Sequence, residues 1–302
     1  MRPFGSSPIL VCSLLSSAVF AQQVPDSAFM YRAGAPAYAQ GKGPVVVLDE
    51  AHFNFHTLGG RYYAFGRVLT GDGYVLRPGT EPFTRTSLKD ARILVMANAL
   101  PDTGEWNLPT ASAVTPDECT AVKQWVSEGG SLFLIADHMP FGGAAADLGA
   151  AFGFNWVNGF AFRKDEGREV FSRKTGNLLP NAVTDGAGPA ERIDSIQLFT
   201  GSAFLAPPEA TVITSLLDDY RILMPERAWQ ISDTTAYIEG RHFVNGAMLP
   251  FGQGRVVCFG EAALFSAQLA GPQRRPMGMN APGSEQNPQL LLNVIHWLDH
   301  RL

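Results

Sequence analysis

The sequence predicts an α/β protein built as a three-layer sandwich, with a mainly parallel sheet and a β-rich insertion. Four short apolar runs, rich in β-branched residues, are typical of strands buried on both faces. These runs span residues 45–49, 93–97, 131–136 and 255–259. Helical patterns lie between and after the runs, and strands that alternate with helices favour right-handed crossovers and parallel pairing.

Capping signals mark where the predicted helices begin. Thr115 and Pro116, followed by Glu118, are typical of a capping box with proline at the first helical position. An Asn-Pro pair at residues 287–288 gives a similar start to the last predicted helix. Residues 155–250 hold short β-like runs instead, and we interpret them as an insertion of strands and loops packed against the sheet.

The chain is predicted to comprise a leader, a lead-in and one domain. Residues 1–21 have a positive start, a short apolar core and a small-residue cleavage pattern, which predicts a secretory signal peptide rather than a membrane anchor. Residues 22–43 predict a flexible lead-in, and residues 44–302 a single α/β domain with its insertion at about 155–250. We therefore expect a periplasmic or secreted protein without a membrane span after signal removal.

Polar residues follow three of the predicted strands directly. Asp49 and Glu50 end the first strand, Asp137 and His138 end the third, and Glu261 ends the fourth. The carboxyl ends of parallel strands meet at one edge of a sheet, where ligands bind in open α/β folds. The sequence therefore predicts that these side chains share one cleft.

The residue types near this edge suggest acid–base chemistry, because carboxylates and imidazoles transfer protons. The predicted catalytic residues are Glu50, His52, Asp137, His138 and Glu261. The predicted substrate-binding residues are Asp49, Asn98, Phe141 and Asn280. His52 and His56 are also candidate ligands of a divalent metal such as zinc, manganese or iron, the one cofactor that this set suggests.

Structural roles for the same residues stay open. The acidic pair at 49–50 equally suits a helix cap or an ion pair with Arg61, and the two histidines that follow suit an irregular loop. Residues 137–138 equally suit a buried, hydrogen-bonded turn. Glu261 suits the start of a helix, where the dipole favours an acid.

Three segments resemble the class I glutamine amidotransferase-like superfamily: the strand with Asp-Glu-Ala-His at 45–52, residues 129–138 and residues 254–261. The likeness is greatest to an exported branch of unassigned function, and more distant to trehalose-utilisation proteins and to domains of gliding-motility transport proteins. It implies a flavodoxin-like, three-layer fold. Amidotransferases of this kind carry a nucleophilic Cys in the turn after the strand that matches 131–136. This chain has Asp-His-Met-Pro there, so the resemblance does not extend to glutamine hydrolysis by a thiol.

Two functional hypotheses follow from these observations. The first is an exported hydrolase that uses the carboxylate and histidine cluster, with water as nucleophile, on a glycan or a glycan-linked ester or amide. The second is a non-catalytic module of amidotransferase-like fold that binds a ligand or serves an envelope complex. Both hypotheses expect a small-molecule or glycan ligand as partner. Nucleic acid is not expected, because the net charge is −5 and the sequence has no basic cluster.

Overall fold

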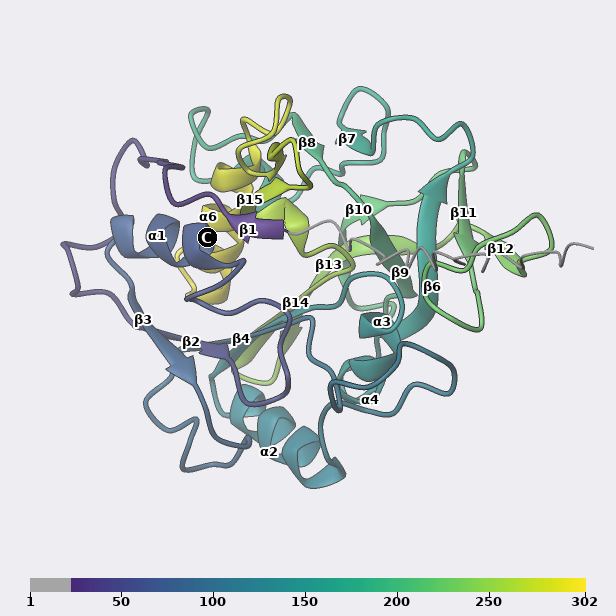
Figure 1. Cartoon of the computed structure of the whole chain (residues 1–302). Helices are drawn as coiled ribbons and strands as arrows, with labels where there is room; N and C mark the ends of the chain where they lie inside the picture. The colour runs from purple at the N-terminus through teal and green to yellow at the C-terminus, as the bar shows by residue number, and fades with distance from the viewer. Residues whose placement is uncertain (1–22) are drawn as a thin grey trace, which may run out of the picture.

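The computed structural model describes residues 23–302, and the predicted signal peptide at 1–21 lies outside this part of the chain. Five strands form a parallel half: β2 (Val45–Asp49), β3 (Val75–Gly79), β4 (Ile93–Ala97), β5 (Ser131–Ile135) and β14 (Gly254–Phe259). Six strands form an antiparallel half: β6 (Asn155–Arg163), β9 (Gly201–Leu205), β10 (Thr211–Ser215), β11 (Tyr220–Leu223), β12 (Tyr237–Glu239) and β13 (Val244–Phe251). Together they make one eleven-stranded sheet in the order β12-β11-β6-β9-β13-β14-β5-β4-β2-β3, with β10 paired to β13 (Figure 1).

The predicted three-layer sandwich with a mainly parallel sheet is therefore wrong, although the four strands expected to run parallel do so. The difference begins between β13 and β14, which only Gly252 and Gln253 connect. A two-residue turn forces antiparallel pairing, and Gly252 takes the positive φ of 59° that suits such turns. Apart from residues 170–172 and 195–197, the strands of the insertion extend the sheet from this point, so they continue it rather than pack against it.

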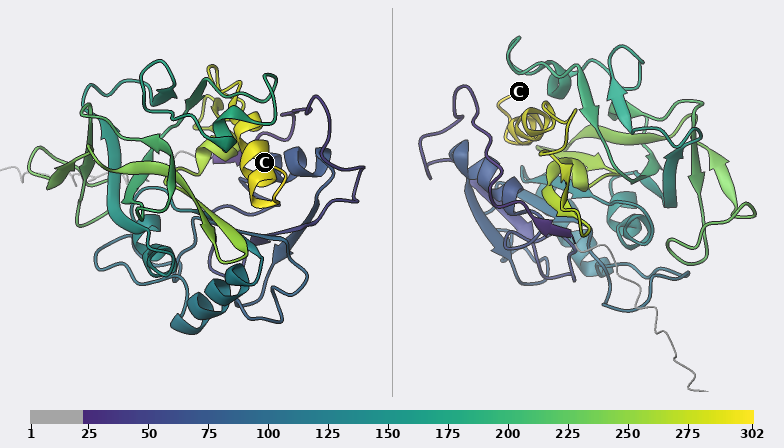
Figure 2. Two further views of the ribbon diagram at one scale, coloured as in Figure 1. Left: turned by 180° about the vertical axis from the view of Figure 1, so that it is seen from behind. Right: turned by 45° about the horizontal axis from the view of Figure 1, so that its top comes forward.

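Helices cover both faces of the parallel half (Figure 1). α1 (Tyr63–Gly71) and α6 (Asn287–Leu298) lie on one face, side by side in both views of Figure 2, and α2 (Pro116–Ser127) lies on the other. Successive strand residues point to opposite faces, so Val46 and Leu48 join the core of α1 and α6, whereas Val47 joins that of α2. Shorter segments are α3 (Phe141–Ala144), α4 (Ala146–Ala150), α5 (Ala182–Asp185) and the 3₁₀ turn η1 (Ala263–Phe265). No helix of residues 23–302 has the length and apolar character to cross a bilayer.

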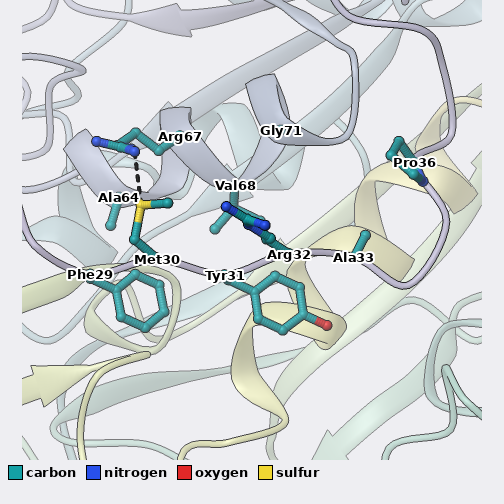
Figure 3. Close-up of a pocket in the computed structure, with 10 residues that line it drawn as sticks. All are labelled: Phe29, Met30, Tyr31, Arg32, Ala33, Pro36, Ala64, Arg67, Val68 and Gly71. Carbon is teal, nitrogen blue, oxygen red and sulfur yellow. Dashed lines mark hydrogen bonds between the residues drawn. The ribbon is translucent and has the colours of Figure 1, made fainter.

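The segment expected to be a flexible lead-in is attached to the domain. Its β1 (Gln23–Pro25) forms a three-stranded sheet with β15 (Ala267–Ala270) and β16 (Arg275–Gly278). Elsewhere, β7 (Val170–Ser172) and β8 (Ser195–Gln197) form a separate two-stranded sheet. Beyond β1, the Tyr31 hydroxyl donates to Gln289 Oε1 at 2.6 Å and the Tyr38 hydroxyl donates to Asp299 Oδ2 at 2.6 Å. Figure 3 shows this segment along α1, with Arg67 directed at the Met30 sulfur beside a cavity of about 310 Å³. Aromatic anchors within an Ala- and Gly-rich stretch therefore order it.

Candidate functional site

A cavity of about 1150 Å³ lies at the carboxyl edge of the parallel strands. The lining residues that follow β2, β4, β5 and β14 are Phe55, His56, Arg61, Asn98, Asp137, His138, Phe141, Glu261 and Ala263. The antiparallel half contributes residues 199–200 and 227–230, and Trp106 comes from the loop between β4 and α2. The cavity thus occupies the edge where parallel strands place ligands, and both halves of the sheet wall it.

The structure divides the predicted site residues into two sets. Six line the cavity: His56, Asn98, Asp137, His138, Phe141 and Glu261. Four lie outside its lining: Asp49, Glu50, His52 and Asn280. The second set makes hydrogen bonds within the protein, which are described below.

Hydrogen bonds between neighbouring loops fix the strand ends that form the cavity floor. The Asn98 N–H donates to the Ile135 carbonyl at 3.0 Å, and the Ala136 N–H donates to the Phe259 carbonyl at 2.9 Å. The Asn98 Oδ1 in turn accepts the Asp137 N–H at 2.9 Å. Asn98 adopts a positive φ of 47°, which Asn tolerates better than most residues. The chain is therefore locked in place where Asp137 begins.

His138 presents one free ring nitrogen at the cavity. Its Nδ1 lies 2.7 Å from the Met139 carbonyl oxygen. A carbonyl only accepts, so Nδ1 carries the proton and Nε2 keeps its lone pair in the neutral ring. The ring stacks on Phe160 at a centroid distance of 4.7 Å and meets Trp229 edge-on at 4.6 Å. These contacts hold a basic nitrogen in a fixed orientation without occupying it.

Glu261 is fully buried and accepts four backbone N–H groups. Its Oε1 accepts those of Ala263 at 2.9 Å and Leu264 at 3.3 Å. Its Oε2 accepts those of Phe199 at 3.2 Å and Thr200 at 2.8 Å. One carboxylate therefore joins the turn after β14 to the loop before β9.

Two glycines permit this junction. A Cβ on Gly260 would lie 2.5 Å from the Ser202 carbonyl oxygen, and a Cβ on Gly201 would lie 2.4 Å from the Gly260 carbonyl oxygen. Both distances are far below a normal contact, so only glycine allows the backbones to approach. The Ser202 N–H donates to the Gly260 carbonyl at 2.7 Å across this contact. The approach brings residues 199–200 within reach of Glu261.

Asp137 and Glu261 are two buried carboxyl groups that influence each other. Burial raises the pKa of Asp137, and the His138 charge and N–H lower it only in part. Burial also raises the pKa of Glu261 well above its usual range, and the Asp137 charge raises it further against its backbone donors. Such a pair titrates as a unit, with the proton lost at higher pH than an exposed carboxyl would lose it.

His52 lies between two carboxylates outside the cavity. Its Nδ1 is 2.9 Å from Asp49 Oδ1, and its Nε2 is 2.9 Å from Glu118 Oε1. Glu118 also completes the predicted capping box of α2, because its Oε2 accepts the Thr115 N–H at 2.9 Å. Both ring nitrogens are thus occupied, and His52 links the end of β2 to the start of α2.

The His52 cluster should make stability depend on pH. Burial alone would lower the pKa of His52, but Asp49 and Glu118 raise it overall above 6.5. Burial alone would raise the pKa of Glu118, but its hydrogen bonds lower it from 4.5 to about 2. The Glu118 contribution is present above pH 4.5 and is lost as pH falls toward 2. The His52 contribution is complete below pH 6.5 and is lost as pH rises through the raised pKa.

We therefore expect the free energy of unfolding to fall on both sides of the range between pH 4.5 and 6.5. Urea denaturation across pH 3 to 9 measures this. The variant His52→Asn should lose about 3–5 kcal/mol near pH 6, because it leaves two buried carboxylates without their partner. The exposed His242, changed in the same way, is the matched control. An unchanged pH profile in His52→Asn would show that the cluster does not couple protonation to folding.

Glu50 and Asn280 also serve local structure. Glu50 Oε1 accepts the Leu58 N–H at 2.7 Å and so closes the loop after β2. Asn280 Nδ2 donates to Asp26 Oδ2 and to the Gln268 carbonyl, both at 3.0 Å, and so joins the lead-in to β15. Neither contact directs a functional group at the cavity.

The residues suggested as metal ligands do not converge. Within residues 23–302, no group of three or more His, Cys, Asp or Glu side chains has a geometry that could hold a metal ion. His52 has both nitrogens engaged by carboxylates, whereas His56 lines the cavity. The donor set proposed from the sequence therefore does not fit a divalent metal.

Several cavity residues carry buried polar atoms without a hydrogen-bond partner. Both ring nitrogens of His56, the Nδ2 of Asn98 and the Oε1 of Gln268 are in this state. Burial lowers the pKa of His56 well below its usual range, and the nearby Arg61 and His138 lower it further, so the ring is neutral. Buried polar groups are rarely left unpaired, and a ligand or water in the cavity would pair these.

The sequence did not single out other cavity residues. Arg61, Phe199, Thr200, Trp229 and Gln268 all line it. Trp229 is 52% exposed and has a positive φ of 67°, so backbone strain and an exposed aromatic coincide at the cavity. No motif marks these positions, and Phe199, Thr200 and Trp229 reach the cavity only when the antiparallel half folds against the strand ends.

Comparison with known proteins bears on the fold. No family model matches the chain, and no match was found among curated proteins. Among solved structures, the N-terminal domain of mmIFT52 is similar with a TM-score of 0.60 and 13% identity, covering 84% of this chain and 97% of that domain. A ThuA-like protein from Bacteroides uniformis has a TM-score of 0.49 and 15% identity, covering 89% and 94%. Cytoplasmic Protein STM1381 from Salmonella typhimurium LT2 has a TM-score of 0.49 and 14% identity, covering 84% and 99%.

These similarities correct the predicted superfamily. The expected membership of the class I glutamine amidotransferase-like superfamily is wrong, because the similar structure with a TM-score above 0.5 is the mmIFT52 N-terminal domain and not a glutamine amidotransferase. Of the three, only the mmIFT52 domain exceeds a TM-score of 0.5, and at 13% identity it supports a shared fold alone. The chain therefore has the fold of the mmIFT52 N-terminal domain.

Proposed function

We propose that the cavity is the active site of an exported hydrolase in which His138 is the general base and Asp137 the general acid. The observation that carries this proposal is their position: two buried carboxyl groups and an imidazole with an unoccupied Nε2 line one cavity. Clusters of buried titratable groups with raised pKa values in a cavity are typical of acid–base sites. The expected signal peptide supports export to the periplasm or beyond.

The Asp137–Glu261 pair and His138 can together supply one acid and one base. Burial raises the pKa of both carboxyls, and the Asp137 charge raises that of Glu261 further, so the pair retains a proton at a higher pH than exposed carboxyls would. This proposal assigns the proton used in catalysis to Asp137. A protonated Asp137 donates to the leaving group, while His138 Nε2 removes a proton from the attacking water. Glu261 joins the turn after β14 to the loop before β9, and as the coupled partner of Asp137 it helps the pair to retain this proton.

Water is the nucleophile in this proposal. Of the side chains that line the cavity within residues 23–302, only Thr200 carries a hydroxyl or thiol nucleophile. Its hydroxyl donates to its neighbour's carbonyl at 2.8 Å, which leaves it no base as partner. Cys119 and Cys258 lie elsewhere.

The aromatic lining favours a glycan, or an ester or amide linked to one, as substrate. Phe55, Trp106, Phe141, Phe199 and Trp229 line the cavity. Phe55, Trp106 and Phe141 pack together at centroid distances of 5.2 to 5.7 Å. Aromatic faces pack on the apolar faces of sugar rings, and the unpaired polar atoms would meet their hydroxyls.

A panel of chromogenic glycosides, sugar esters and N-acyl sugars tests the proposal. We expect hydrolysis of at least one class, and a loss of about 10²- to 10⁴-fold in kcat in Asp137→Asn, because the amide cannot donate a carboxyl proton. Binding of the same substrate should survive the substitution. Turnover that is equal in the variant and the wild type would contradict the role of Asp137.

A non-catalytic ligand-binding module is the second candidate. The observation that favours it is the saturation of Glu261 by four backbone donors, which is also how a purely structural carboxylate behaves. Calorimetry with the same panel separates the two candidates. Ligand binding without turnover in the wild-type protein would favour the module.

A further inference from the structure

We propose that the cavity contains an anion-binding subsite, centred on Arg61, that selects a sugar carrying a carboxylate. The inference rests on the proposed function, because the subsite lies in the same cavity. It adds the class of substrate: an acidic sugar of the uronic acid type rather than a neutral one.

The first observation is a half-buried guanidinium without a counter-ion. Arg61 lines the cavity, with its Cζ 3.7 Å from the centre of the Phe55 ring. Its hydrogen bonds are long: Nη1 donates to the Phe55 carbonyl and Nε to Gln23 Oε1, both at 3.3 Å. No carboxylate of residues 23–302 forms an ion pair with it, whereas Arg92 pairs with one carboxylate and Arg173 with two. A partly desolvated charge is costly without a partner, so an anionic ligand would stabilise it.

The second observation is the set of unpaired atoms on residues that line the same cavity as Arg61. The neutral ring of His56 is 3% exposed, has one N–H to donate, and has no partner in the protein. The Asn98 Nδ2 is a further unpaired donor, and the Gln268 Oε1 is an unpaired acceptor. The unpaired donors would meet a carboxylate, and the unpaired acceptors, Gln268 Oε1 and the second His56 nitrogen, would meet the hydroxyls of the same sugar.

The geometry of Arg61 favours a carboxylate as the anion. The Arg61 Cζ lies over the Phe55 ring, and within residues 23–302 Nη2 donates no hydrogen bond, so it remains available to a ligand. A planar guanidinium matches a carboxylate through two parallel hydrogen bonds. The aromatic lining provides a surface for the ring that carries this group.

Binding measurements test the subsite without requiring turnover. The probes are glucuronate and galacturonate, with glucose and galactose as neutral matches and inorganic phosphate as a third arm. Calorimetry or saturation-transfer NMR on the wild-type protein should show uronates binding about 10- to 100-fold more tightly than the neutral sugars, as a charge-assisted hydrogen bond implies. Arg61→Gln should remove this difference, and Arg61→Lys should restore part of it.

Arg67→Gln is the matched control, because it removes the same charge from an exposed arginine outside the cavity that also faces an aromatic ring. It should leave uronate binding unchanged. Equal binding of acidic and neutral sugars, or an unchanged preference in Arg61→Gln, would overturn the proposal. Phosphate binding that depends on Arg61, in the absence of uronate binding, would also overturn it. If uronates bind as expected but no substrate is hydrolysed, only the proposed hydrolysis fails.

Discussion

Replacing His138 by Gln is expected to lower kcat by about 10²- to 10⁴-fold on the substrate found with the panel, because the general base is lost. Gln can still donate to the Met139 carbonyl that now accepts from Nδ1, so the turn after β5 should keep its shape. Thermal unfolding should therefore change little, while turnover falls. Steady-state kinetics and a melting curve on the same preparation measure both quantities.

His242→Gln is the control for this substitution, because His242 is exposed and lies outside the cavity lining. It should leave kcat at the wild-type value. If His138→Gln unfolds the protein, His138→Asn and external imidazole provide a second test, since imidazole that restores turnover identifies the missing base. A wild-type kcat in folded His138→Gln would remove His138 from the mechanism.

Replacing Glu261 by Ala is expected to lower the free energy of unfolding by about 3–5 kcal/mol, the range for removing one partner of a buried charged network. Four backbone N–H groups lose their acceptor at a position that is 0% exposed. Glu261→Gln should have a smaller effect, because one oxygen still accepts while the new amide group faces two donors. Urea denaturation of both variants measures the series.

Glu285→Gln gives the corresponding baseline. Glu285 is exposed and accepts a single N–H, that of Gly283, at 2.9 Å. Its substitution should change the free energy of unfolding by no more than about 0.5 kcal/mol. A loss of less than about 1 kcal/mol in Glu261→Ala would mean that the loops around it are held by other contacts.

The strand ends were predictable from the sequence because they follow from local pattern. Apolar runs set the parallel strands, and parallel strands share an edge, so Asp137, His138 and Glu261 were expected together and line one cavity. The positions of His52 and Glu50 were harder to predict, because side-chain direction in the irregular loop after β2 depends on partners far away. One such partner is Glu118, at the start of α2.

The antiparallel half was least predictable, because its strands pair across long sequence separations. Trp156 of β6, for example, faces Phe204 of β9. Short runs with weak alternation do not reveal that they extend the parallel sheet, and the predicted fold class was wrong for this reason. The role of residues 199–200 was not predictable for the same reason. Their N–H groups donate to Glu261 only after β9 reaches the end of β14.

The burial of His296 was also not predictable from the sequence. His296 carries no signal beyond its place on the last helix, yet it is buried and its Nε2 lies 2.6 Å from Asp72 Oδ2. Asp72 also accepts the Ala37 N–H at 2.8 Å, so this pair joins α6, the end of α1 and the lead-in. Contacts between segments more than 200 residues apart leave no local trace in the sequence.

The pH dependence of kcat/KM tests the central claim, that His138 and Asp137 act as base and acid, most directly. The acid must be protonated, so activity should fall as pH rises through the raised pKa of Asp137. We expect an alkaline limb in the wild type that is lost in Asp137→Asn, and a fall of about 10²- to 10⁴-fold in kcat/KM in His138→Gln that leaves this limb in place. A wild-type profile without an alkaline limb, one that keeps this limb in Asp137→Asn, or an unchanged kcat/KM in His138→Gln would contradict the assignment.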